Sequence, residues 1–243
     1  MGRSVNKLTE KCNLISVIVL IIVSSALSAA GLLNPSWQVV DIKEFRAEHH
    51  HGLWLDCTRP ERIHTNNIPN DEPFHCTYKF DVSALEIIDE NIDDIDENSA
   101  AGESEHHQFF EWHKVVLVVF VGSLILNAVA LCMAICASCS GGCSTLFSII
   151  LALSLFLSMV GDGVFFFAAH RVDNRFVQGL IGTYEQMIGV AFYMHLSGTI
   201  LLLFSLILSI IFAYQILGKT VADNMSLQEV RVFNSEGRRT SVF

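Results

Sequence analysis

Charged residues are scarce in this chain, and basic residues are scarcer than acidic ones. Only 16% of the 243 residues are Asp, Glu, Lys or Arg, and the formal net charge is −10. A chain this acidic is poorly suited to bind a polyanion, so nucleic acid is not an expected partner. The polar segments also contain no recognisable catalytic motif: no Ser, His and Asp in the order of a known catalytic triad, no glycine-rich phosphate loop and no zinc-peptidase helix. We therefore expect no enzyme, no cofactor and no catalytic metal.

The apolar residues, which make up 51% of the chain, are concentrated in four long runs. Such clustering is typical of a membrane protein and not of a soluble core. The first run has 20 uncharged residues, enough to cross a hydrocarbon layer of about 30 Å as a helix. The runs predict transmembrane helices at 14–33, 115–137, 145–169 and 190–214. The remaining segments are 1–13, a first loop (34–114), a short turn (138–144), a second loop (170–189) and a tail (215–243).

Basic residues predict the orientation of these helices. Residues 1–13 and 215–243 together contain seven Lys and Arg, so the positive-inside rule places both termini in the cytoplasm. We expect a multi-pass protein of the plasma membrane with both loops outside the cell. A cleaved signal peptide is the alternative for the first run, because residues 25–30 offer small side chains at plausible cleavage sites. The apolar region of a signal peptide is usually shorter, about 7–15 residues.

Two of the seven cysteines, Cys57 and Cys76, lie 19 positions apart in the polar first loop. Exposed cysteines outside the cell oxidise, so we expect a disulfide bond between them. In the chain-entropy model such a bond contributes about 3 kcal/mol. Residues with high β-propensity predict strands at 37–45, 52–55 and 74–80. A small antiparallel sheet held by the disulfide fits this pattern.

The first loop is strongly acidic, with 18 Asp and Glu against six Lys and Arg, a formal charge of −12. Ten of the acidic residues lie in an insert at 81–105 that has too few apolar residues to fold alone. We interpret it as solvated; calcium binding is the alternative, although the EF-hand spacing is missing. The loop also holds eight of the ten histidines, including His49–His51, His106 and His107. We interpret these as solvated, with zinc binding or proton sensing as alternatives.

The first loop resembles the claudin superfamily of tetraspan membrane proteins, which includes the peripheral myelin proteins and the stargazin-like channel subunits. The matching residues are Trp37, Gly52-Leu53-Trp54, Cys57 and Cys76. Residues 37–45 are most similar to the nematode claudin-like (Clc-like) branch, and Gly189 to Tyr193 resembles the family's start of the last helix. The gap between the cysteines is longer than in typical claudins, and the acidic insert has no counterpart. The resemblance implies a mainly α membrane protein, a four-transmembrane-helix bundle with a small extracellular antiparallel β-sheet.

Two non-enzymatic functions follow from this resemblance. The first is cell–cell contact or a paracellular barrier at cell junctions, with same-family proteins in the same or the opposing membrane as partners. The alternative is an auxiliary subunit that modulates an ion channel or receptor. A loop of charge −12 that lines a paracellular path would favour cations. Co-purification with a channel would favour the auxiliary function.

Two ionisable residues, Asp162 and His195, lie clearly within the predicted helices. Their depths from the outer helix ends agree within about one helical turn. A carboxylate is costly in lipid and should face a partner inside the bundle. We therefore expect Asp162 and His195 to form a hydrogen bond between the third and fourth helices, and an ion or proton path is the functional alternative.

Cysteines also cluster at the inner end of the second helix, at positions 132, 136, 139 and 143. Juxtamembrane cysteines are candidates for S-palmitoylation, as the claudin resemblance also implies, and we predict it at Cys139 and Cys143. Zinc coordination would need all four thiolates to converge, which a position inside the bilayer disfavours for Cys132.

The chain ends in Ser241-Val242-Phe243, a hydroxyl-x-apolar pattern typical of peptides that bind PDZ domains as an added strand. The polar tail before it is expected to be flexible, and a cytoplasmic PDZ scaffold is the expected partner. Claudins usually end in Val, so Phe243 leaves the choice of scaffold open. Arg238-Arg239 before Ser241 resembles a kinase site, and phosphorylation of Ser241 would release the partner. The alternative is a disordered tail whose arginines lie against anionic lipid.

Overall fold

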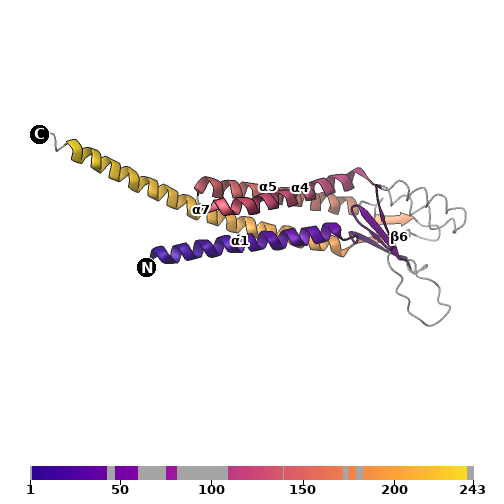
Figure 1. The fold of residues 1–243 in the computed structure, drawn as a ribbon. Helices are drawn as coiled ribbons and strands as arrows, with labels where there is room; N and C mark the ends of the chain where they lie inside the picture. The colour runs from indigo at the N-terminus through magenta and orange to yellow at the C-terminus, as the bar shows by residue number, and fades with distance from the viewer. Residues whose placement is uncertain are drawn as a thin grey trace. The chain divides into compact units, whose positions relative to one another are not determined.

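The structure, a computed structural model, describes residues 2–42, 47–59, 75–80, 109–138, 140–171, 175–178 and 183–239. Within these residues, four helices are long and apolar enough to span a membrane (Figure 1). Their spanning parts are Thr9–Leu33, Glu111–Ala137, Gly141–Ala169 and Val190–Ala222. The predicted four-helix membrane fold is therefore confirmed. The predictions for the acidic insert, His106, His107, Cys139 and residues 241–243 lie outside the described residues.

The four helices extend beyond the predicted spans. They are α1 (Gly2–Leu33), α4 (Glu111–Ala137), α5 (Gly141–Ala169) and α7 (Val190–Arg239). The expectation of a flexible tail after the last span is wrong up to Arg239, because α7 continues to that residue. The tail contains residues with good helix propensity, such as Ala, Met, Leu, Gln and Glu. Adding them to an existing helix requires no new nucleus, so polar composition was a poor guide here.

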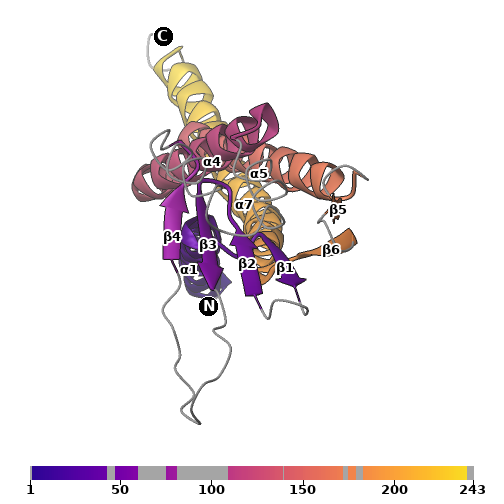
Figure 2. The same cartoon turned by 90° about the vertical axis from the view of Figure 1, so that its right-hand side faces the viewer.

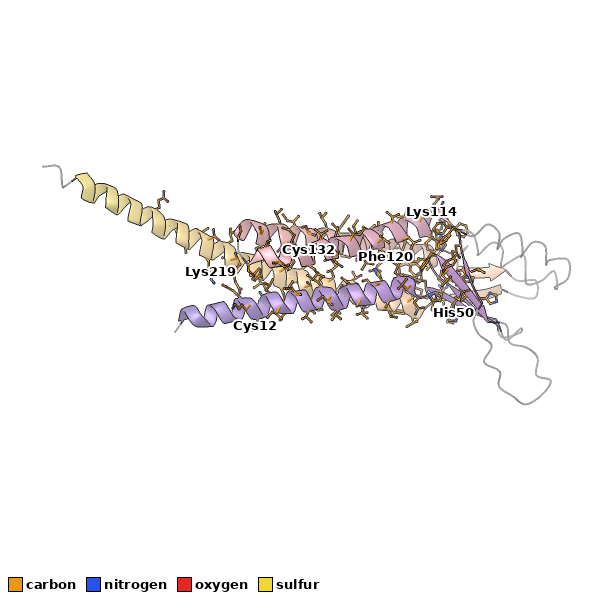
Figure 3. The ribbon with its side chains drawn as sticks, in the orientation of Figure 1. Cys12, His50, Lys114, Phe120, Cys132 and Lys219 are labelled. Carbon is orange, nitrogen blue, oxygen red and sulfur yellow. A yellow bond between two sulfur atoms is a disulfide. The ribbon has the colours of Figure 1, made fainter. Side chains whose placement is uncertain are left out.

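The chain divides into two compact units, and the first contains Met1–Ser24, Ile125–Leu155 and Ile200–Phe243. Apolar side chains from all four helices form its core. Alanines at 130, 134 and 137 lie on one face of α4, where small side chains allow close helix packing. Polar contacts join helices within this unit: Ser154 Oγ donates to Asn127 Oδ1 at 2.7 Å, and Lys219 on α7 forms an ion pair with Glu10 on α1 (Figure 3).

The second unit, Ser25–Leu124 and Phe156–Thr199, contains the β-sheet. All strand pairings are antiparallel, and the strand order is β4-β3-β2-β1-β6-β5 (Figure 2). Both predicted extracellular loops contribute, because Gln38 in β1 pairs with Ile188 in β6. The strands are β1 (Gln38–Ile42), β2 (Ala47–His51), β3 (Leu55–Arg59), β4 (His75–Tyr78), β5 (Phe176–Gln178) and β6 (Thr183–Ile188).

The sheet differs from the predicted strands in two respects. Strands were expected at 37–45 and 74–80, and β1 and β4 lie within those ranges. The strand expected at 52–55 is wrong, because Gly52, Leu53 and Trp54 form the connection between β2 and β3. Strands β5 and β6 were not predicted. The partner of β6 is β1, which lies about 150 residues earlier in the chain, so no local pattern indicates this pairing.

Candidate functional site

Two tryptophans, Trp37 and Trp54, cap the C-terminal end of α1. Trp37 Nε1 donates to Gly31 O and Trp54 Nε1 donates to Leu32 O, both at 2.9 Å. The last carbonyls of a helix have no partner within the helix. The Trp54 indole satisfies Leu32 O, and Gly31 O accepts from the Trp37 indole as well as from the Asn34 N–H. The Trp37 ring is fully buried against Phe120 and Phe165, with ring centroids 5.6 and 4.9 Å apart. The signature thus ties the sheet to the end of this helix.

Gly52 of the same signature forms a tight turn. Its N–H donates to Leu55 O at 3.0 Å and lies 3.1 Å from Asp56 Oδ1. A Cβ at this position would overlap Leu55 O and lie 2.9 Å from Pro35 Cα. Only glycine fits so close to two backbone segments, so the turn from β2 into β3 requires glycine at position 52.

The predicted disulfide is confirmed. Cys57 in β3 and Cys76 in β4 lie opposite each other in the register, with their Cα atoms 4.1 Å apart. The bond links β4, which is an edge strand, to the rest of the sheet. Edge strands pair on one side only, so a covalent link contributes most there.

A polar row crosses four strands of the sheet. Gln38, His51, Asp56 and Thr77 lie directly opposite one another in the register of β1 to β4. Directly opposite residues share one face of a sheet. Gln38, His51 and Asp56 are buried. The interpretation of His49–His51 as solvated is therefore wrong for His51, and His50 shares a 2.6 Å hydrogen bond with Ser36 Oγ (Figure 3).

Lys79 brings a buried ammonium group to this row. Its Nζ lies 3.4 Å from Asp56 Oδ1 and 3.2 Å from His113 Nε2 on α4. Burial lowers the pKa of Lys79 below its ordinary value, and the nearby Asp56 carboxylate opposes that shift. The carboxylate also lies 3.6 Å from His51 Nδ1. Asp56 is thus the counterion of a buried cation.

A cavity of about 10 Å³ lies beside the cluster, which is about the space that one water molecule needs. Gln186 of β6 and His113 of α4 line it, and both side chains are buried. Gln186 Oε1 and His113 Nδ1 have no hydrogen-bond partner among the described residues. The cavity suits a water molecule and is too small for an organic ligand. In the described ranges, no group of three or more His, Cys, Asp or Glu is arranged to hold a metal ion.

Sequence reasoning missed Lys79 and Gln186. A weak signal was present for Lys79, which lies between Tyr78 and Phe80. Neighbouring side chains of a strand point to opposite sides, so the strand predicted at 74–80 would place Lys79 on the other face from both aromatic rings. Its partner Asp56 lies on a different strand, and His113 lies on a helix. Gln186 gave no such signal, because its strand was not predicted.

Asp162 of α5 and His195 of α7 form the hydrogen bond predicted from their similar depths in the two helices. His195 Nδ1 is 2.8 Å from Asp162 Oδ1, and Thr199 Oγ1 donates to Asp162 Oδ2 at 2.7 Å. All three side chains are buried. Thr199 was missed, although it lies one turn after His195 on the same face of α7. Both carboxylate oxygens therefore have a partner inside the apolar bundle.

The ring of Phe120 on α4 packs against this second cluster. Its ring centroid lies 3.7 Å from that of His195. A Cβ at Gly161 would overlap the Phe120 ring, so the glycine before Asp162 lets the ring lie close to α5. The buried Phe120 ring is an apolar neighbour of the Asp162–His195 pair, and a low local dielectric strengthens hydrogen bonds.

Asp162→Leu is expected to destabilise the protein by about 1–3 kcal/mol, because it removes two interhelical hydrogen bonds of roughly 0.6–1.7 kcal/mol each. Thermal unfolding in detergent and delivery to the cell surface measure the effect. Gly163→Ala is the matched control, since a Cβ at this adjacent position meets no atom within 4 Å. Unchanged stability and surface delivery of Asp162→Leu would exclude a stabilising role for the pair.

The described cysteines near the connection between α4 and α5 differ in exposure. Cys132 and Cys136 of α4 are exposed, and Cys143 of α5 is half-buried. The palmitoylation sites Cys139 and Cys143 stay a prediction.

Comparisons with known proteins agree with this architecture. A family model described as Clc-like matches residues 11–220, a range that contains the sheet and both buried polar clusters. Clc-like protein 2 of Caenorhabditis elegans is 28% identical over 201 residues, which cover 81% of this chain and 73% of that relative. The chain therefore belongs to the Clc-like family of claudin-like membrane proteins.

Proposed function

We propose that this protein acts without catalysis at contacts between cells, where it forms or regulates the path between neighbouring plasma membranes. One observation carries the proposal: strands from both predicted extracellular loops form a single sheet, held by the Cys57–Cys76 disulfide and tied to α1 by Trp37 and Trp54. A sheet fixed in this way presents a defined surface outside the membrane. Such a surface suits binding to the same kind of protein in the same or the opposing membrane.

The charge of the first loop indicates what such a path would conduct. Residues 34–114 carry a formal charge of −12. Ten of the acidic residues in this loop lie in the insert at 81–105. A path lined by one sign of charge raises the local concentration of the opposite ion. We therefore expect the protein to favour cations over anions between cells.

The expected result in epithelial monolayers is a higher sodium-to-chloride permeability ratio when the protein is expressed. Replacing the ten acidic residues at 81–105 by Asn and Gln should abolish that preference, since it removes most of the loop's charge. A variant with Asp and Glu exchanged for each other keeps the charge and is the matched control. Dilution potentials measure the ratio, and anion preference of the unmodified protein would contradict the proposal.

The auxiliary-subunit alternative predicts a different result. The protein would then co-purify in fixed stoichiometry with a channel or receptor and would be absent from strands at cell contacts. Imaging of tagged protein at contacts, together with purification from the same cells, separates the two functions. The predicted PDZ ligand and the predicted palmitoylation are compatible with both functions, so neither feature distinguishes a cell-contact protein from an auxiliary subunit.

A further inference from the structure

Four aromatic side chains form a continuous ladder at the β4 edge of the sheet. Ring centroids are 5.6 Å apart for Trp54 and Tyr78, 5.3 Å for Tyr78 and Phe80, and 6.5 Å for Phe80 and Phe109. Tyr78 and Phe80 are 47% and 58% exposed. Adjacent large aromatic rings rarely remain in water, so this aromatic ladder indicates a contact surface.

Both ends of the aromatic ladder are fixed where helices leave the membrane. Trp54 Nε1 donates to Leu32 O, one residue before α1 ends at Leu33. Phe109 lies two residues before Glu111, where α4 begins. Tyr and Trp are enriched at this level of a membrane, where their rings contact both headgroups and acyl chains.

The outward direction of Tyr78 and Phe80 is set by the residue between them. Lys79 points inward to Asp56, and its backbone N–H donates to Trp54 O at 3.0 Å. Lys79 and Phe80 form a turn at the end of β4, and on either side of the buried Lys79 the rings of Tyr78 and Phe80 are exposed and stack with their centroids 5.3 Å apart. Lys114 also lies here, half-exposed, with its Nζ 5.6 Å from the Phe109 centroid.

We propose that the aromatic ladder is a lipid-binding surface on which the β4 edge of the sheet rests against the outer leaflet. The surface continues the lipid-facing sides of α1 and α4, where Leu33 and Val118 are 62% and 71% exposed. The rings contact the glycerol and upper acyl region of a phospholipid. The Lys114 ammonium, which lies 2.6 Å from Glu111 Oε1, is at the level of the phosphate, the usual position of a lysine near the end of a membrane helix.

The test is photo-crosslinking in native membranes. The full chain carries benzoylphenylalanine at position 80, and covalent adducts are identified by mass spectrometry. Val118 is the positive control within the bilayer. Glu185 is the exposed control on β6, about 16 Å along the strand from the start of α7. We expect phospholipid adducts at positions 80 and 118 and none above background at position 185.

Two results would overturn the proposal. Protein adducts in place of lipid adducts at position 80 would make the aromatic ladder a protein-binding surface. No adduct at position 80, with normal labelling at position 118, would leave the ladder in water. Position 78 repeats the test with a second ring of the ladder. Formation of the Cys57–Cys76 disulfide in each variant shows that the sheet has folded, so a folding failure is not read as a lack of lipid contact.

Discussion

Asp56→Ala is expected to destabilise the protein by about 3–5 kcal/mol, because it leaves the buried Lys79 ammonium without its counterion. The effect is large because the side chains of Asp56 and Lys79 are both almost fully inaccessible to water. Thermal unfolding in detergent and the fraction of protein at the cell surface are the measurements. We expect most of the variant to be retained inside the cell.

The double variant Asp56→Ala/Lys79→Met tests whether the unpaired charge causes this loss. Replacing both partners of a buried ion pair by apolar groups is often neutral, so the double variant should recover much of the lost stability. Glu185→Ala is the matched control, because it removes a half-exposed ion pair with Arg175, a type worth about 0–1 kcal/mol. A double variant no more stable than Asp56→Ala would refute the explanation.

Cys57→Ser is expected to lower stability by about 2–5 kcal/mol, since it releases β4 from its covalent link to β3. Hydrogen exchange should rise first in His75–Tyr78, because among the described strands β4 pairs with β3 alone. Surface delivery and hydrogen exchange in detergent measure the two effects.

Two further variants make this result interpretable. Cys57→Ser/Cys76→Ser should behave like Cys57→Ser if the lost crosslink is the cause. A single variant much worse than the double would instead indicate mispairing of the remaining thiol. Cys12→Ser is the control, because Cys12 is a free, exposed cysteine on α1 and its loss should leave stability unchanged.

Features set by composition or by a short pattern were predictable. Four apolar runs indicated four helices, and two cysteines in a polar loop predicted to lie outside the cell indicated the Cys57–Cys76 bond. The similar depths of Asp162 and His195 indicated their proximity, because the rise of a helix is constant. Each of these inferences uses only the residue types and their positions along the chain.

Features that depend on pairing between distant segments were not predictable. The burial of His51 follows from its position opposite Gln38 and Asp56, and no local pattern sets that register. From the sequence alone, Lys79 would be predicted to be an exposed lysine. Its burial depends on Asp56 and His113, which lie on another strand and on a helix. The Gly-Leu-Trp signature was recognised as a pattern, but its use as a turn and helix cap is visible only in three dimensions.

The pairing of β1 with β6 has a consequence for biosynthesis. The β1 edge is available once residues 38–42 have been synthesised, but its partner at 183–188 emerges about 150 residues later. Two backbone bonds add to this seam, from Gly189 N to Trp37 O at 2.8 Å and from Ala191 N to Ser36 O at 3.0 Å. A nascent chain that ends before residue 183 therefore leaves the β1 edge without its partner β6, and an unpaired strand edge favours pairing with other chains. The six-stranded sheet is thus complete only after synthesis has passed β6 and the start of α7.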